Sequence, residues 1–126
     1  MIWFVIENNK RKYMTSTVSA NVLFEKGWGS GYVAVPPTHP LHLGNLDFMH
    51  GDDVTKLINL VQTLNVNGGI TYNDFGDGKR APKDWWVFGF DTVQPGDTIE
   101  KWPKEAVEAE TKRLFCQLLD IELGEL

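Results

Sequence analysis

The stretch Asp84-Trp-Trp-Val-Phe-Gly-Phe-Asp91 (DWWVFGFD) places four aromatic residues within six consecutive positions and brackets them with two acids. Side chains of a strand alternate between the two faces of a sheet. Trp86, Phe88 and Phe90 would therefore share one face. Three large apolar groups in a row are typical of a sheet face that packs beneath a helix, so this face is predicted to be core.

The opposite face of the same strand is mixed. Gly89 has no side chain there and would let another group approach the backbone. Trp85 and Asp91 offer an indole and a carboxylate beside that gap. This face is either an ordinary structural surface or the wall of a binding site, and the strand alone does not distinguish the two.

Short strands and turns are predicted around this stretch. The segments expected as strands are residues 2–6, about 12–24, 32–35 and 70–72. The segments expected as turns or loops are residues 27–31, 37–51 and 73–83. No internal repeat or domain boundary is visible between them.

Two amphipathic helices complete the expected fold. One begins at Asp52 or Asp53 and ends near Leu64. The other begins at Pro103, whose fixed φ suits a first turn. Its buried stripe is expected to consist of Val107, Leu114, Leu118 and Ile121, flanked by Phe115, with Leu114 and Leu118 facing Phe88. These elements predict a single α+β domain over residues 1–126, with a largely antiparallel sheet and two helices packed on one face.

Charge and composition exclude several classes of protein. The formal net charge is −5 over 126 residues, so no excess of cations supports general nucleic-acid binding. The basic runs at residues 10–12 and 79–80 are interpreted as solvent-exposed hairpin tips or loops. No segment reaches the length of a membrane span and no signal peptide is visible, which favours a cytoplasmic protein without membrane contact. Whether it forms a homo-oligomer stays open.

Metal and thiol chemistry are poorly supported. Cys116 is the only cysteine and is expected as a packed thiol at the edge of the last helix's stripe. His39, His42 and His50 share one loop but lack a further ligand at a recognised spacing. No metal and no cofactor are therefore expected.

A polar ligand site is predicted around a glycine pair. Two glycines after an amphipathic helix suit either a helix stop or a backbone nest that faces a ligand's oxygen atoms. With the mixed face of residues 84–91, they define a site expected to converge on one concave surface. Its predicted residues are Asn67, Gly68, Gly69, Thr71, Tyr72, Trp85, Asp91 and Gln94.

Several short motifs, taken in order, resemble those of small uncharacterised bacteriophage and prophage proteins. They are GYVAVPPTHPL at residues 31–41, VNGGITY at 66–72, WVFGFD at 86–91 with Gly96-Asp97, and EAVEAETKRLFCQLL at 105–119. Such proteins tend to carry His, Cys and His where this chain has Asn67, Thr92 and Gln94. The resemblance implies that groups suited to metal binding or proton transfer have been replaced here by neutral hydrogen-bonding groups.

Two functions from different classes follow as expectations. The first is a non-catalytic binding protein of phage type that captures a host protein or a nucleotide-like small molecule in the host cytoplasm, to counter host defence. The second is a small hydrolase or transferase with Asp91 or Asp97 as the base and His39 or His42 as its partner.

Overall fold

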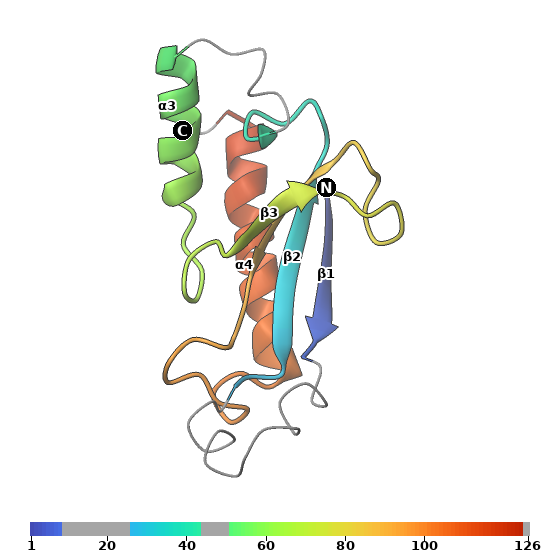
Figure 1. Cartoon of the computed structure of the whole chain (residues 1–126), viewed down its shortest axis with the longest axis vertical. Helices are drawn as coiled ribbons and strands as arrows, with labels where there is room; N and C mark the ends of the chain where they lie inside the picture. The colour runs from blue at the N-terminus through green and yellow to red at the C-terminus, as the bar shows by residue number, and fades with distance from the viewer. Residues whose placement is uncertain (9–25, 44–50, 125–126) are drawn as a thin grey trace.

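The computed structural model describes residues 1–8, 26–43 and 51–124, and shows a four-stranded antiparallel sheet with two helices (Figure 1). The strands are β1 (Ile2–Glu7), β2 (Gly29–Val35), β3 (Tyr72–Phe75) and β4 (Trp86–Phe90), and the helices are α3 (Gly51–Gln62) and α4 (Lys104–Glu122). The sheet order is β1-β2-β4-β3. The α+β fold is thus confirmed, whereas the strand expected at residues 12–24 lies outside the described residues.

The predicted core face of β4 is confirmed. Phe88 and Phe90 are fully buried in one apolar cluster that also contains Leu114 and Leu118 of α4, and Trp86 packs at the edge of this cluster. α3 contributes Leu57 to the same cluster. Both helices therefore contribute to the core on this face of the sheet.

α4 approaches β2 closely because Gly31 has no side chain. A Cβ atom at Gly31 would collide with the hydroxyl of Thr111 and the ring of Phe90. Thr111 is buried in this contact, and its hydroxyl donates a hydrogen bond to the Val107 carbonyl at 2.7 Å. The helix thus packs directly on the backbone of β2 and leaves no polar atom of Thr111 unpaired.

Some sequence-based boundaries are wrong. Gly29–Gly31 is not a turn but the start of β2, because Gly31 pairs with both Val5 and Phe90. The strand expected at residues 70–72 is β3, which runs further into the expected loop because Tyr72 and Phe75 pair with β4. β3 is exposed along its whole length, so it carries no alternating pattern that could have located it.

Cys116 is exposed, not packed. It lies two residues after Leu114, which is about 200° around the helix, and so it points away from the buried stripe. Pro103 is the N-cap of α4 and precedes its first turn. Of the helices in the described ranges, none is long and apolar enough to cross a bilayer.

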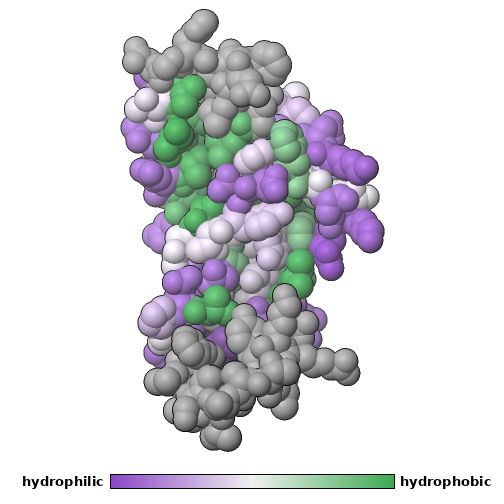
Figure 2. All heavy atoms as spheres, in the orientation of Figure 1, coloured by the Kyte–Doolittle hydropathy of each residue, from purple (hydrophilic) through white to green (hydrophobic). Residues whose placement is uncertain are grey.

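The sheet face opposite the helices carries a second, smaller apolar cluster. Its buried members are Ala34, Val87 and Ala81, the last from the loop between β3 and β4 (residues 76–85). This loop is polar on its outer side, as shown by the purple residues at the right of Figure 2, in the region of the yellow loop of Figure 1. We call this side of the sheet the open face.

Substitution of Phe88 by alanine should reduce the free energy of unfolding by about 3 to 5 kcal/mol, because it removes buried apolar surface and leaves a cavity. Urea denaturation followed by fluorescence measures this loss. The control is Ile99→Ala, which removes an exposed side chain and should change stability by less than about 0.5 kcal/mol. A loss below about 1 kcal/mol for Phe88→Ala would mean that this face is not the core.

Candidate functional site

Three of the predicted site residues, Asn67, Asp91 and Gln94, meet around the buried carboxylate of Asp97. The Asn67 side-chain amide donates to Asp97 Oδ2 at 3.0 Å and to the Asp91 carbonyl at 3.3 Å. Gln94 donates its backbone N–H to Asp97 Oδ2 and its side-chain amide to Asp91 Oδ1, both at 2.9 Å. The sequence analysis named Asp97 as a candidate catalytic base and not among the ligand-binding residues, but its carboxylate is the acceptor that organises this cluster.

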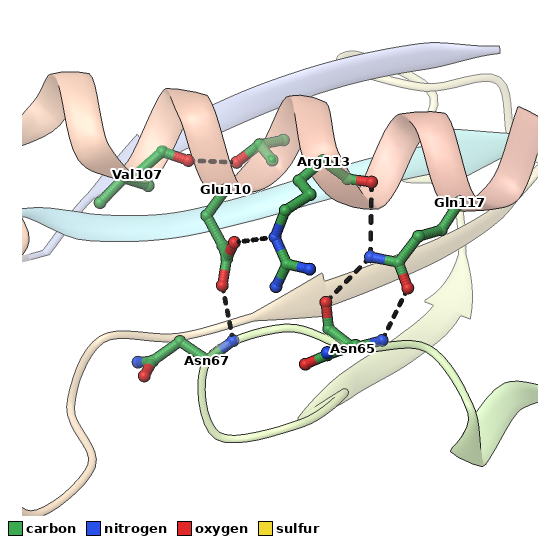
Figure 3. A network of polar contacts seen from close by, with 7 residues as sticks. Asn65, Asn67, Val107, Glu110, Arg113 and Gln117 are labelled. Atoms are coloured by element: carbon green, nitrogen blue, oxygen red, sulfur yellow. Dashed lines mark hydrogen bonds and ion pairs between the residues drawn. The ribbon is translucent and has the colours of Figure 1, made fainter.

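The same segment is fastened to α4 through its backbone (Figure 3). The Asn67 N–H donates to Glu110 Oε2 at 2.9 Å. Gln117 accepts a hydrogen bond from the Asn65 N–H at 2.7 Å and donates one to the Asn65 carbonyl at 2.9 Å. Both side-chain amide hydrogens of Asn67 and its backbone N–H are therefore committed within the protein. Asn67 acts as a structural clamp between α4 and the turn at Asp97.

Gly68 and Gly69 form a turn, and neither stops a helix. Their φ angles are +71° and +76°, and the Gly69 N–H bonds to the Val66 carbonyl at 2.9 Å. α3 has already ended at Gln62, so the helix-stop interpretation is wrong. A Cβ at Gly68 would lie 2.7 Å from Gln94 Cγ. The missing side chain of Gly68 thus makes room for Gln94.

The remaining predicted residues lie elsewhere. Thr71 donates its backbone N–H to the Gly89 carbonyl and has an exposed side chain. Both Tyr72 and Trp85 lie on the open face, where Tyr72 meets the ring of Tyr32 and Trp85 packs against the smaller apolar cluster. The predicted single surface is therefore divided between the two faces of the sheet, because Tyr72 pairs with Gly89 while Asn67 reaches α4 on the other side.

The histidines are engaged in separate structural bonds. His39 Nδ1 accepts a hydrogen bond from the Leu41 N–H, so Nε2 carries the hydrogen and donates to the Leu118 carbonyl at 2.8 Å. Burial lowers the pKa of His39, although the bond to Leu118 opposes this shift. His42 Nε2 donates to the Asp84 carbonyl at 2.7 Å. Both imidazoles therefore hold loop segments in place.

The acids and histidines of the catalytic alternative do not share a network. His39 is bonded to α4 at Leu118, whereas the Asp97 cluster joins α4 through Glu110. These two positions are eight residues apart, or about 12 Å along a helix. Among residues 1–8, 26–43 and 51–124, no three His, Cys, Asp or Glu side chains are grouped so that they could hold a metal ion.

A pocket of about 220 Å³ lies on the open face. We call it the aromatic pocket. Its lining residues are Phe4, Ile6, Tyr32, Tyr72, Phe75, Asp77, Arg80, Ala81 and Val87. The rings of Phe4 and Tyr32 are stacked, with centroids 5.1 Å apart and planes 18° apart, and Tyr72 meets Tyr32 edge-on at 5.5 Å.

Strand register produces this aromatic row. Phe4 pairs with Tyr32, while Tyr32 and Tyr72 both pair with Gly89, so all four positions share one face. A Cβ at Gly89 would lie 2.5 Å from Tyr32 Cδ1. The gap at Gly89 was expected to let another group approach, but the ring of Tyr32 and the Cβ of Tyr72 fill it, and both residues line the pocket.

Asp77 and Arg80 form the polar rim of the pocket. Asp77 Oδ1 accepts hydrogen bonds from the backbone N–H groups of Lys79 at 2.7 Å and Arg80 at 2.8 Å, which lower the pKa of Asp77. Arg80 Nη1 lies 3.4 Å from Asp77 Oδ2, and the two side chains are 52% and 46% exposed. Asp77 therefore shapes the loop, while the guanidinium stays available at the mouth of the pocket.

Sequence reasoning missed most of this pocket. Of its lining residues only Tyr72 was predicted as a site residue. Phe4 and Tyr32 were assigned to strands, but the side chains beside them depend on how strands from distant parts of the chain pair with one another. The Lys79-Arg80 run in the sequence was the available signal for the rim, and it was interpreted as a solvent-exposed tip or loop.

Asn67→Ala should reduce the free energy of unfolding by about 1 to 3 kcal/mol, because it removes one of the two donors to the buried Asp97 carboxylate and leaves only the Gln94 N–H. Asn67→Asp should cost more, since it adds a carboxylate beside Asp97. Urea denaturation measures both, with Asn73→Ala on the exposed edge strand as the control. If the unfolding free energy of Asn67→Ala equals that of the wild type, Asn67 is not a clamp.

The Tyr72 phenol should titrate above its ordinary pKa of 10.0, because burial raises the pKa and the nearby Asp74 and Asp77 add to the shift. A phenol that is harder to ionise in the folded state stabilises the fold below the unfolded pKa. This stability is lost as pH rises through the folded pKa. Tyrosinate absorbance, as the difference between wild type and Tyr72→Phe, isolates this group, and a midpoint at or below 10 would contradict the expectation.

Comparisons of the chain with protein-family models, with curated proteins and with solved structures give no match. Support for a function therefore comes from the aromatic pocket and its rim.

Proposed function

We propose that the protein is a binding protein that holds a planar group in the aromatic pocket and leaves it chemically unchanged. The observation that carries this proposal is the row of Phe4, Tyr32 and Tyr72 along the open face. Aromatic rings and a few polar groups are the usual lining of small-molecule sites. The row thus provides stacking and edge contacts for a second ring system.

The pocket's size favours a small ring system. Its volume is about 220 Å³, below the range of about 300 to 1,000 Å³ that is typical of drug-sized ligands. An apolar cavity of about 150 Å³ in another protein holds benzene. One ring or two fused rings would therefore fill the aromatic pocket, which suits a nucleotide-like molecule better than an extended protein surface.

The groups around the pocket favour binding over catalysis. Asp77, the carboxylate of the lining, has one oxygen engaged by backbone N–H groups of its own turn. His39 and His42 are bonded to main-chain carbonyls and do not line the pocket. General acid–base chemistry needs a titratable group within hydrogen-bond reach of the substrate, and neither histidine offers that here.

In the setting that the phage resemblance implies, such a protein would act in the host cytoplasm. Sequestering a small signalling or metabolic compound would deny it to a host defence system. This role requires tight binding without turnover, which agrees with a pocket built from rings and hydrogen-bonding groups.

Titration of the isotope-labelled protein with the four ribonucleosides, as neutral planar probes, tests the proposal. Backbone NMR shifts should change at Tyr32, Tyr72 and Val87 for at least one probe. Tyr32→Leu should weaken that binding by about 5-fold or more, since stacking on an aromatic side chain contributes about 1 to 3 kcal/mol. Mass spectrometry should recover the probe unchanged.

The control is Phe115→Leu, the same kind of change on the helix side of the molecule, which should leave the affinity as it is. Shifts that map away from the open face, or equal affinity for wild type and Tyr32→Leu, would refute the aromatic pocket as the binding site. Conversion of a probe to a product would refute the non-catalytic role.

A further inference from the structure

We infer that the ligand of the aromatic pocket is a mononucleotide, with its base against the tyrosine rings and its phosphate on Arg80. This inference rests on the proposed function, because it names the chemical class held by the same pocket. It is carried by the hydrogen-bonding capacity left unused around the pocket and by the local charge of its rim.

Arg80 has most of its binding capacity unused. A guanidinium carries five N–H donors, and the ion pair of Arg80 in the structure is a single 3.4 Å contact with Asp77 on the solvent side. Arginine binds phosphate oxygens through two parallel hydrogen bonds. The guanidinium that a phosphate would bind at the mouth of the pocket is half-exposed, and the turn that Asp77 stabilises fixes the backbone of Arg80.

The rim is cationic in an acidic protein. Residues 76–85 contain Lys79, Arg80 and Lys83 against Asp77 and Asp84, a local net charge of +1, whereas the whole chain carries −5. Lys79 and Lys83 are exposed. These cations attract an anionic group to the loop beside the pocket, although Asp74, near Tyr72, reduces the local excess of positive charge.

The walls of the pocket suit a heterocycle better than a hydrocarbon ring. The hydroxyls of Tyr32 and Tyr72 make no hydrogen bond to any residue in the described ranges, and each can both donate and accept one. Asp77 Oδ2 adds an acceptor beside them. The ring nitrogens and exocyclic groups of a nucleobase would satisfy these atoms, whereas a phenylalanine side chain of a partner would leave them unpaired.

A single nucleotide fits this arrangement better than a nucleic-acid strand. Binding along a strand uses a cationic groove that follows several phosphates. Among the residues that the structure describes, Arg80 is the cation that lines the pocket, and Lys79 and Lys83 belong to the same loop. The rim can thus neutralise one phosphate group, and the net negative charge of the chain opposes the approach of more.

The affinities of the four ribonucleosides and their 5′-monophosphates, measured by NMR titration at low ionic strength, test this inference. The monophosphate of the preferred base should bind about tenfold tighter or more, as expected for a charge-assisted hydrogen bond. Added salt should reduce this advantage. Arg80→Gln should abolish it, so that this variant binds the nucleoside and its monophosphate with about equal affinity.

Arg113→Gln is the matched control, because Arg113 is also half-exposed and also pairs with an acid three residues away, Glu110, but on α4. It should keep the full preference for the monophosphate. If nucleosides bind in a Tyr32-dependent way but monophosphates bind no tighter, or if Arg80→Gln keeps the preference, the mononucleotide inference is refuted and the binding function stands.

Two further results would also decide the matter. If neither nucleosides nor monophosphates bind, both the function and the ligand class are refuted. A single-stranded hexanucleotide that binds more than tenfold tighter than the best monophosphate would instead assign the open face to single-stranded nucleic acid.

Discussion

The packing of α4 on the backbone of β2 is the contact on which the rest of the structure depends. It requires a glycine at position 31, because Thr111 occupies the space of its side chain. From this contact the helix also reaches Phe88 and Phe90 on β4 through Leu114 and Leu118. One face of the sheet is thereby fully committed to the core, and the other is left for the smaller cluster and the aromatic pocket.

α4 also organises the polar atoms on its side of the molecule. Glu110 and Gln117 bind the backbone of the segment between α3 and β3, and the Leu118 carbonyl binds His39. Backbone groups that leave regular secondary structure need such partners. The polar residues that bind these segments are therefore explained by the connections they hold.

Much of the fold could be predicted from the sequence, because the strongest patterns are local. The Phe88 face of β4 and the stripe of α4 follow from periodicities of two and 3.6 residues. β3 was misplaced because an exposed edge strand has no buried face to impose a pattern. Cys116 was wrongly expected to be packed. Its position two residues after Leu114 already places it on the far side of the helix.

The candidate site was harder to predict because glycines beside polar residues have more than one use. Gly68 makes room for Gln94 and Gly89 makes room for Tyr32, so both gaps are filled by the protein itself. Polar side chains near a glycine therefore do not by themselves mark a ligand site. The aromatic row depends on which residues of distant strands are paired, and no local pattern encodes that register.

The two faces of the sheet differ in how completely their polar groups are satisfied, and this difference separates stability from binding. On the helix side, Asn67 and Gln94 both donate hydrogen bonds to the buried Asp97 carboxylate, and the loss of either donor would weaken its solvation by the protein. On the open face, Tyr32 and Tyr72 line the pocket, and the half-exposed Arg80 makes a single 3.4 Å contact with Asp77. A ligand gains free energy only from groups that the protein has not already used. The open face therefore holds the capacity for recognition, although most of the polar residues that first suggested a site lie on the other side.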